Sequence, residues 1–309
     1  MRGFEVTEGQ LCVGGVPLQR LAQRAGQTPF YAYDRGLIQR RVAEVRAVLP
    51  VGVQLHYAIK ANPMPALLSC LAPLVDGMDV ASGRELSAAL DAGCAPAHIS
   101  FAGPGKREGE LRQAVAAGVL LHIESFREVE LLARLSAEMQ LPARVAVRIN
   151  PDFDLRGAGM RMGGGAKPFG VDTEQVPSVL KAIGAAGLQF EGFHLYPGSQ
   201  NLKGDLIAQA LAVCSRELAL AGFKAQLGSL AIFYRFTQNF FVCRGEERHL
   251  ANLVEILPNR VGRIAPRNTR MPHWVSTPPP LNKRRTATSI NPSRQSLAHR
   301  GHSTCPSSV

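Results

Sequence analysis

Short apolar runs alternate with helix-period segments through the first two thirds of the chain, and this alternation restricts the fold more than any other feature. A strand, a helix and a further strand in succession build a parallel sheet covered by helices. We expect six strands, at residues 53–59, 74–80, 98–102, 119–123, 143–149 and 188–195. Five helices are expected at residues 35–48, 83–92, 107–117, 126–139 and 204–221.

Several of these helix ends carry the residues that helix ends prefer. Asp34 and Ser125 stand at N-cap positions, and Gly93 and Gly118 follow two helices where a left-handed residue is needed. The strands are apolar on both faces, which is typical of a sheet covered on both sides. About six units predict an α/β fold of the (β/α)8-barrel type, incomplete in its number of units. The spacing alone also permits an open doubly wound sheet.

The net charge of +11 is concentrated near the C-terminal end. Residues 1–226 hold 23 Lys and Arg against 21 Asp and Glu, whereas residues 227–309 hold 12 against 3. The second segment is rich in Pro, Ser and Arg without apolar periodicity, so it cannot bury enough surface to offset its ordering entropy. We therefore expect residues 227–309 to form an atypical, basic and largely disordered tail. Its basic run at residues 283–285 lacks interleaved aromatic residues, which disfavours a nucleic-acid partner.

The apolar runs, the N-terminal residues and the cysteines also restrict the cellular compartment in which the protein is expected. No run approaches the roughly 18 apolar residues that span a bilayer, and Glu5 and Glu8 stand where a signal peptide is basic and then apolar. The six cysteines lie far apart without a Cys-x-x-Cys pair, so neither a disulfide framework nor a metal site is predicted. We expect a cytoplasmic protein that has no membrane partner.

Lys60 directly follows the first barrel strand. In barrels of this type the reactive residues lie at the C-terminal ends of the strands, where the loops between strands and helices meet. An amine at that mouth is expected to be partly desolvated and nucleophilic, able to form a Schiff base with an aldehyde. The alternative is a solvated lysine with a structural role only.

Six segments, taken together and in this order, resemble the alanine-racemase-like (fold type III) pyridoxal-phosphate-dependent decarboxylases, in the diaminopimelate and ornithine decarboxylase group. Residues 157–170 and 192–200 are most similar to the exosortase-associated decarboxylases of that group. Each segment alone is a weak signal, whereas the ordered set is specific. The segments are Tyr57 to Pro63, Met78 to Leu86, Ile99 to Lys106, Val147 to Pro151, Lys167 to Gly170 and Gly192 to Gln200.

The resemblance implies that Lys60 binds pyridoxal 5'-phosphate as a Schiff base and that an amino-acid substrate loses its carboxylate as CO₂. It also implies that Gly198 and Ser199 help to hold the phosphate, although Ser199 could equally be a turn serine. Tyr196 stands where the family has a histidine that stacks on the cofactor ring. Tyrosine offers a ring face but no imidazolium charge.

Asp79, Arg148 and His194 are further candidates for binding the cofactor, by their positions in the same motifs. Each also has a structural interpretation. Arg148 could simply pair with carboxylates, and His194 could be a satisfied barrel histidine that only supports the site. Glu85, in the same motif as Asp79, suits the first turn of a helix because of the helix dipole.

The resemblance ends near Gly222. Relatives continue with a glycine-rich phosphate segment, a glutamate that pairs with the pyridine nitrogen, and a β-domain that completes the partner subunit's site. We expect that a frameshift or an aberrant end has replaced this third of the protein, which would leave open sheet edges and an unfilled core. The predicted domains are residues 1–30, as the N-terminal segment of the β-domain, residues 31–226, as a partial barrel, and the tail.

The sequence is therefore compatible with three related functions. The resemblance implies a decarboxylase that forms a homodimer if the full fold forms, and the altered C-terminal third leaves the activity of this chain undecided. A pyridoxal-phosphate-dependent racemase or a non-catalytic pyridoxal-phosphate-binding protein would share Lys60 and Ser199. The residues that select the substrate's distal group lie in the altered region, so the sequence does not name the substrate.

Overall fold

Six parallel strands form the framework of the fold. The computed structural model describes residues 4–47, 49, 51–150, 160–161, 167–196, 198–199, 230–236 and 239–245. Each expected strand is present, with neighbours paired in parallel. The strands are β4 (Gln54–Ala58), β5 (Gly77–Val80), β6 (Ile99–Phe101), β7 (Leu120–Ile123), β8 (Arg144–Asn150) and β11 (Gln189–Leu195).

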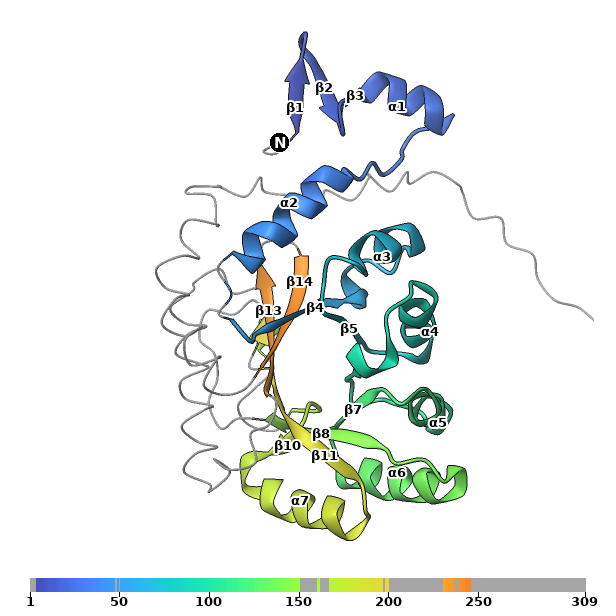
Figure 1. Cartoon of the computed structure of the whole chain (residues 1–309), viewed down its shortest axis with the longest axis vertical. Helices are drawn as coiled ribbons and strands as arrows, with labels where there is room; N and C mark the ends of the chain where they lie inside the picture. The colour runs from blue at the N-terminus through green and yellow to red at the C-terminus, as the bar shows by residue number, and fades with distance from the viewer. Residues whose placement is uncertain are drawn as a thin grey trace, which may run out of the picture. The chain divides into compact units, whose positions relative to one another are not determined.

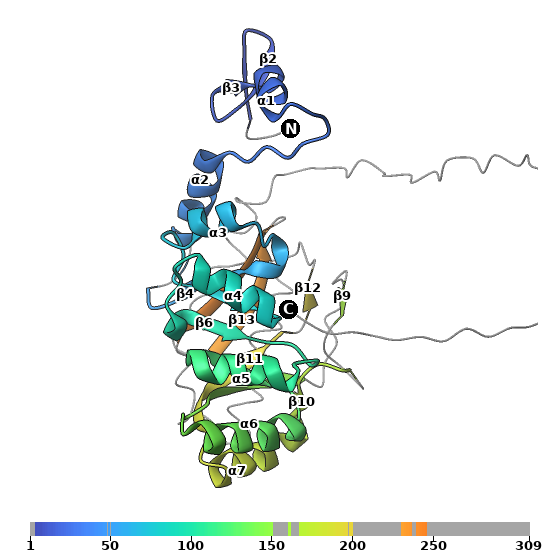
Figure 2. The same cartoon turned by 90° about the vertical axis from the view of Figure 1, so that its right-hand side faces the viewer.

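Helices alternate with these strands and cover their outer side (Figure 1). Figure 2 shows α3 to α6 following one another alongside the sheet. Asp34 and Ser125 cap α2 and α6 by accepting a backbone N–H bond, as predicted. The helices are α2 (Arg35–Arg46), α3 (Pro65–Leu71), α4 (Gly83–Asp91), α5 (Glu108–Ala117), α6 (Phe126–Met139) and α7 (Val176–Ala185). The pattern did not predict α3 and α7, and the helix expected at 204–221 lies outside the described residues.

An antiparallel hairpin joins the two ends of the parallel arc. Its strands are β13 (Leu230–Phe236) and β14 (Asn239–Gly245). β13 pairs with β11 in parallel, β14 pairs with β4 antiparallel, and β7 pairs with β8, so eight strands form a closed ring. The expectation of open edges at β4 and β11 is therefore wrong, because hairpin backbone groups complete both ladders. The (β/α) barrel is confirmed, with seven of these eight strands running parallel and β14 antiparallel to both of its neighbours.

The remaining elements are short. A three-stranded antiparallel sheet of β1 (Glu5–Thr7), β2 (Gln10–Val13) and β3 (Val16–Pro17) precedes α1 (Leu18–Ala25). The pairs β8–β10 (Val171–Asp172) and β9 (Met160–Arg161)–β12 (Gly198–Ser199) lie near the strand ends. Among the described residues there are also three 3-10 turns: η1 (Ile59–Ala61), η2 (Pro96–His98) and η3 (Thr173–Gln175).

The strands are apolar on the face that packs against the helices. The expectation of two apolar faces is wrong, because the alternate strand positions include buried polar residues such as His56, Asp79 and His122. Side chains of alternating strand positions, such as Leu55, Met78, Ile99 and Val145, are fully buried against the helices. In the part of the chain that is described, no helix is long and apolar enough to cross a membrane. The domain boundaries at 30/31 and 226/227 stay predictions, and most of the proposed tail lies outside the described residues.

Gly77 begins β5 where the packing leaves no room for a side chain. An added Cβ would collide with the carbonyl oxygen of His98 and lie 2.5 Å from the ring of His56. We expect Gly77→Ala to lower the free energy of unfolding by about 1–3 kcal/mol, the usual cost of overpacking, in a urea titration. Gly109→Ala, which meets nothing within 4 Å in helix α5, is the control and should leave that energy unchanged or slightly raised. Equal effects of the two substitutions would contradict the packing argument.

Candidate active site

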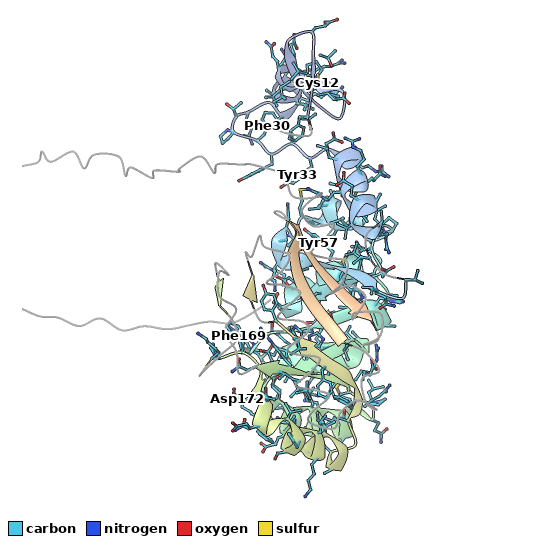
Figure 3. The ribbon with its side chains drawn as sticks, turned by 90° about the vertical axis from the view of Figure 1, so that its left-hand side faces the viewer. Cys12, Phe30, Tyr33, Tyr57, Phe169 and Asp172 are labelled. Carbon is cyan, nitrogen blue, oxygen red and sulfur yellow. The ribbon has the colours of Figure 1, made fainter. Side chains whose placement is uncertain are left out.

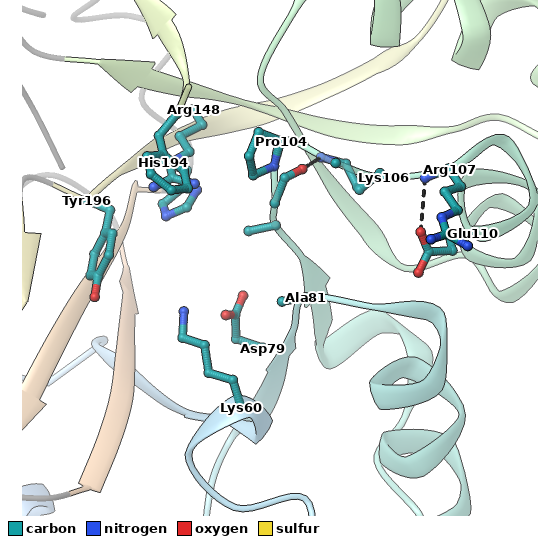
Figure 4. A pocket seen from close by; sticks show the side chains of 14 residues that line it. Lys60, Asp79, Ala81, Pro104, Lys106, Arg107, Glu110, Arg148, His194 and Tyr196 are labelled. Atoms are coloured by element: carbon teal, nitrogen blue, oxygen red, sulfur yellow. Dashed lines mark hydrogen bonds between the residues drawn. The ribbon is translucent and has the colours of Figure 1, made fainter. Parts of the chain in front are cut away.

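A cavity of about 570 Å³ lies at the C-terminal ends of the strands (Figure 4). This is the edge at which the loops that follow parallel strands meet, so residues far apart in the sequence come together there. Five of the seven predicted site residues line the cavity: Lys60, Asp79, Arg148, His194 and Tyr196. The other lining residues are Ala81, Ala102, Gly103, Pro104, Gly105, Lys106, Arg107, Glu110 and Phe169.

Lys60 lies on the η1 turn directly after β4. Its side chain is exposed, so the predicted desolvation is wrong: the residue stands at the open rim rather than inside the barrel. Its Nζ atom lies 5.5 Å from the centroid of the Tyr196 ring. The amine therefore faces an aromatic surface while remaining accessible to a ligand in the cavity.

Hydrogen bonds fix the turn that carries this lysine. Tyr57 Oη donates to the carbonyl oxygen of Asn62 at 3.4 Å, and the Met64 N–H donates to Asn62 Oδ1 at 3.0 Å. Asn62 Nδ2 in turn donates to Tyr33 Oη at 2.8 Å, which ties the turn to the segment before α2. Figure 3 labels Tyr33 in that segment. Burial raises the pKa of Tyr57 to about 12, so this phenol keeps its proton and remains a donor.

Asp79 is a buried carboxyl group on β5 that points toward Lys60 in Figure 4. Ser100 Oγ donates to its Oδ1 at 3.0 Å. Desolvation raises the pKa of Asp79 to about 7, although the positive charge of Lys60 and the Ser100 hydrogen bond act in the opposite direction. The group therefore exchanges its proton near neutral pH, as a proton donor and acceptor must.

Arg148, near the end of β8, is buried between charged and aromatic partners. Its Nη1 donates to Glu124 Oε2 at 2.9 Å, and its guanidinium lies 4.9 Å from the Phe169 ring centroid and 5.7 Å from that of Tyr196. Glu124 was missed at the sequence level, although an acidic residue directly after a buried strand, at the same edge as Lys60, is the signal that could have found it.

A second buried ion pair lies behind this one. Lys106 Nζ contacts Glu128 Oε1 at 2.9 Å and also donates to the carbonyl oxygens of Gly103 and His122. Glu128 Oε2 accepts the N–H of Glu124 at 2.8 Å. Desolvation raises the pKa of Glu128 against the opposing charge of Lys106. Each charge in this cluster has a partner, as buried charges require.

The other predicted residues differ in how far the structure describes them. His194 is buried against His122, with ring centroids 4.3 Å apart, and desolvation lowers its pKa well below the ordinary value, so it is neutral. Gly198 and Ser199 are placed only by their backbone, in β12 three residues or fewer beyond Tyr196. Glu85 accepts the Ala81 N–H at 2.6 Å in the first turn of α4, which agrees with its structural interpretation.

The raised pKa of Asp79 predicts a pH dependence of stability. Between about pH 4 and pH 7 the folded protein binds more protons at this residue than the unfolded chain, so its contribution to stability falls as the pH rises. We expect Asp79→Asn to gain stability relative to wild type, by a larger amount at about pH 8 than at about pH 4, in urea titrations.

Asp76 supplies a control of the opposite sign. Burial would raise its pKa, but hydrogen bonds from Arg46 and the Leu55 N–H outweigh this effect and keep the pKa below its usual range. Its stabilising contribution is therefore present at neutral pH and is lost as the pH falls through the acidic range. Asp76→Asn should lose stability at about pH 8. The same pH response in both variants would refute the assignment for Asp79.

Comparison with known proteins places this site in context. The family described as "Pyridoxal-dependent decarboxylase, pyridoxal binding domain" matches residues 35–227, more than half of the chain. A diaminopimelate decarboxylase of Aquifex aeolicus is 37% identical over 206 residues, covering 64% of this chain and 48% of that protein. The L-glutamyl-[BtrI acyl-carrier protein] decarboxylase of Niallia circulans is 35% identical over 187 residues, covering 60% and 44%.

A solved structure agrees with these matches. The diaminopimelate decarboxylase of Helicobacter pylori, crystallised with L-lysine, superposes with a TM-score of 0.60 at 31% identity, covering 66% of this chain and 54% of that one. The chain thus spans about half the length of the relatives it matches. The family match ends at residue 227, close to the point where the sequence resemblance ends. The barrel, the ordered motifs and the family match together show that this chain belongs to the pyridoxal-dependent decarboxylases, through their pyridoxal-binding domain.

Proposed function

We propose that this chain holds pyridoxal phosphate at Lys60 and that its site serves the decarboxylation of an amino acid. One observation carries the proposal: an accessible amine, a buried carboxyl group that titrates near pH 7, and a tyrosine ring with a fixed arginine surround one cavity at the barrel mouth. That set suits a planar anionic aldehyde. The family match supports the same cofactor class.

The residues of the cavity fit pyridoxal phosphate by their chemistry. A cavity of about 570 Å³ lies within the usual size range of small-ligand sites. Lys60 offers a primary amine for the aldehyde carbon, and Tyr196 offers a ring face for a planar heterocycle. Gly198 and Ser199, in β12, are the proposed phosphate-binding residues, because a glycine permits close approach of backbone N–H groups and serine adds a hydroxyl donor.

Pyridoxal phosphate, when bound, supplies an electron sink for the pair that remains on the substrate's Cα as CO₂ leaves. Lys60 Nζ would bind the cofactor and exchange a proton at each cycle, and Asp79, next to it, would accept or return that proton near pH 7. The neutral ring of His194 would support the site without adding charge. Arg148 would keep a positive charge near the Tyr196 ring.

The proposed substrate is an amino acid that loses its carboxylate. The relatives share decarboxylation in their names but differ in the molecule named, from diaminopimelate to a glutamyl group on a carrier protein. The likeness to these relatives therefore supports decarboxylation as the reaction. It does not assign the distal group of the substrate. A homodimer stays a prediction.

Lys60→Ala should abolish covalent capture of the cofactor. We expect wild-type protein incubated with pyridoxal phosphate and then reduced with borohydride to gain a stable adduct on residue 60, detected by peptide mass spectrometry, because that amine faces the Tyr196 ring at the cavity rim. Lys181→Ala, on helix α7, is a matched control at a lysine outside the cavity and should keep the adduct. An adduct that persists in Lys60→Ala would reject the proposed anchor.

Product analysis separates the related functions. Released ¹⁴CO₂ from carboxyl-labelled diaminopimelate, lysine, ornithine or arginine, dependent on Lys60, would establish decarboxylation. Inversion of the substrate's configuration with the carboxylate retained would instead establish a racemase. Bound cofactor that yields neither product with any of these amino acids would show a binding protein without this catalytic activity.

Tyr196 provides a second test of the same site. Tyr196→Leu removes the ring face, and we expect the affinity for pyridoxal phosphate to fall by roughly fivefold to tenfold, the value of one aromatic contact of about 1 kcal/mol. Tyr196→Phe keeps the face and should bind within about twofold of wild type. The measurement is an absorbance titration of the bound cofactor. Equal losses in the two variants would assign the effect to the hydroxyl group and not to stacking.

A further inference from the structure

The Glu124 carboxylate holds together three segments at the barrel mouth. Its Oε1 accepts the Gly103 N–H at 2.6 Å, from the loop after β6. Its Oε2 accepts Arg148 Nη1 at 2.9 Å and the Gly170 N–H at 3.2 Å, from β8 and from the residue before β10. Only 1% of this side chain is exposed, so these charge-assisted bonds replace its hydration shell.

The backbone at both glycines is suited to this role. Gly103 has φ +137° and Gly170 has φ +78°, conformations that favour glycine. A Cβ on Gly170 would lie 3.0 Å from the Arg148 carbonyl oxygen and 3.0 Å from the Asn150 nitrogen. The loop therefore approaches β8 closely enough for its N–H to reach the carboxylate that also holds the arginine.

The guanidinium of Arg148 depends on this carboxylate for its position. On its other sides it meets the rings of Phe169 and Tyr196, at 4.9 and 5.7 Å from their centroids. Ring contacts restrict the distance of a guanidinium but leave its rotation within the plane free, whereas a hydrogen bond to one Nη atom sets that rotation. The bond to Glu124 thus orients Arg148, and the Tyr196 ring packs against an oriented cation.

We propose that Glu124 is a positioning residue: it fixes Arg148 against Tyr196 and thereby sets how firmly, and in what orientation, the cavity holds a planar anionic cofactor. This inference rests on the proposed function for the identity of that cofactor. The role of Glu124 is exerted through Arg148 and two loops, and it does not require contact with the cofactor itself.

The chain offers a matched control in Glu128. This glutamate is also buried and also pairs with a cation, Lys106, but its oxygens contact that lysine and the Glu124 backbone, and it does not line the cavity. Glu124→Gln and Glu128→Gln each remove one buried negative charge at nearly constant volume. A general loss of stability should appear in both variants, whereas a positioning effect should appear in Glu124→Gln alone.

The first experiment is a titration of the full chain with pyridoxal phosphate, followed by absorbance and by the induced circular dichroism of the bound cofactor. We expect Glu124→Gln to raise the Kd by about tenfold and to change the sign or intensity of the induced signal. Glu128→Gln should lower the urea midpoint while the Kd stays within about twofold and the induced signal is retained. Identical cofactor binding in wild type and Glu124→Gln would overturn the inference.

A second experiment needs no cofactor, so it separates failure of this inference from failure of the proposed function. The ¹⁵N NMR signal of the Arg148 Nε–H, assigned with Arg148→Lys, reports the order of the guanidinium. We expect Glu124→Gln to shift or broaden this signal and Glu128→Gln to preserve it. A signal unchanged by Glu124→Gln would refute the positioning role, even if wild type fails to bind pyridoxal phosphate. That failure would by itself refute only the proposed function.

Discussion

The site depends on full compensation of charges that the barrel buries at its mouth. Two glutamates and two cations, in the pairs Glu124–Arg148 and Lys106–Glu128, sit almost without solvent, and each would be costly alone. Main-chain N–H and carbonyl groups from neighbouring loops form further hydrogen bonds with these four charged side chains. Because loop N–H groups donate to the same carboxylates that pair with the cations, the interactions that neutralise the buried charges also fix the positions of the loops. These loops line the cavity and so determine its shape.

Two ionisable groups facing the cavity respond to burial in opposite ways. Desolvation favours the neutral form of each, so Asp79 gains affinity for a proton and His194 loses it. The cavity lining therefore combines basic side chains, among them Lys60 and Arg148, with a carboxyl group whose pKa is raised to about 7. The basic side chains attract an anion, while the Asp79 carboxyl group can still gain or lose a proton near neutral pH.

Much of the barrel could be predicted from the sequence because its strand segments are rich in apolar residues and its helices carry clear caps, as at Asp34 and Ser125. Helix α3 was missed because it is seven residues long and begins at a proline, and α7 because its apolar run reads as a strand as readily as a helix. Ring closure could not be predicted, since pairing across β11, β13, β14 and β4 depends on contacts distant in sequence.

In the site, motif order identified Lys60 and Asp79. The position of Glu124 directly after a strand is visible in the sequence, but its pairing with Arg148 depends on the register of β7 and β8.

The turn that carries Lys60 is attached to the chain on its upstream side as well as to its own strand. The bond between Asn62 and Tyr33 joins the residue directly after η1 to the residue that precedes the N-cap of α2. One phenol and one amide therefore connect the start of α2 to the turn that follows β4. The position of the Lys60 amine is consequently coupled to the linker at residues 30–34. Substitutions in this linker alone could therefore shift the position of the Lys60 amine during evolution, while every cavity-lining residue stayed the same.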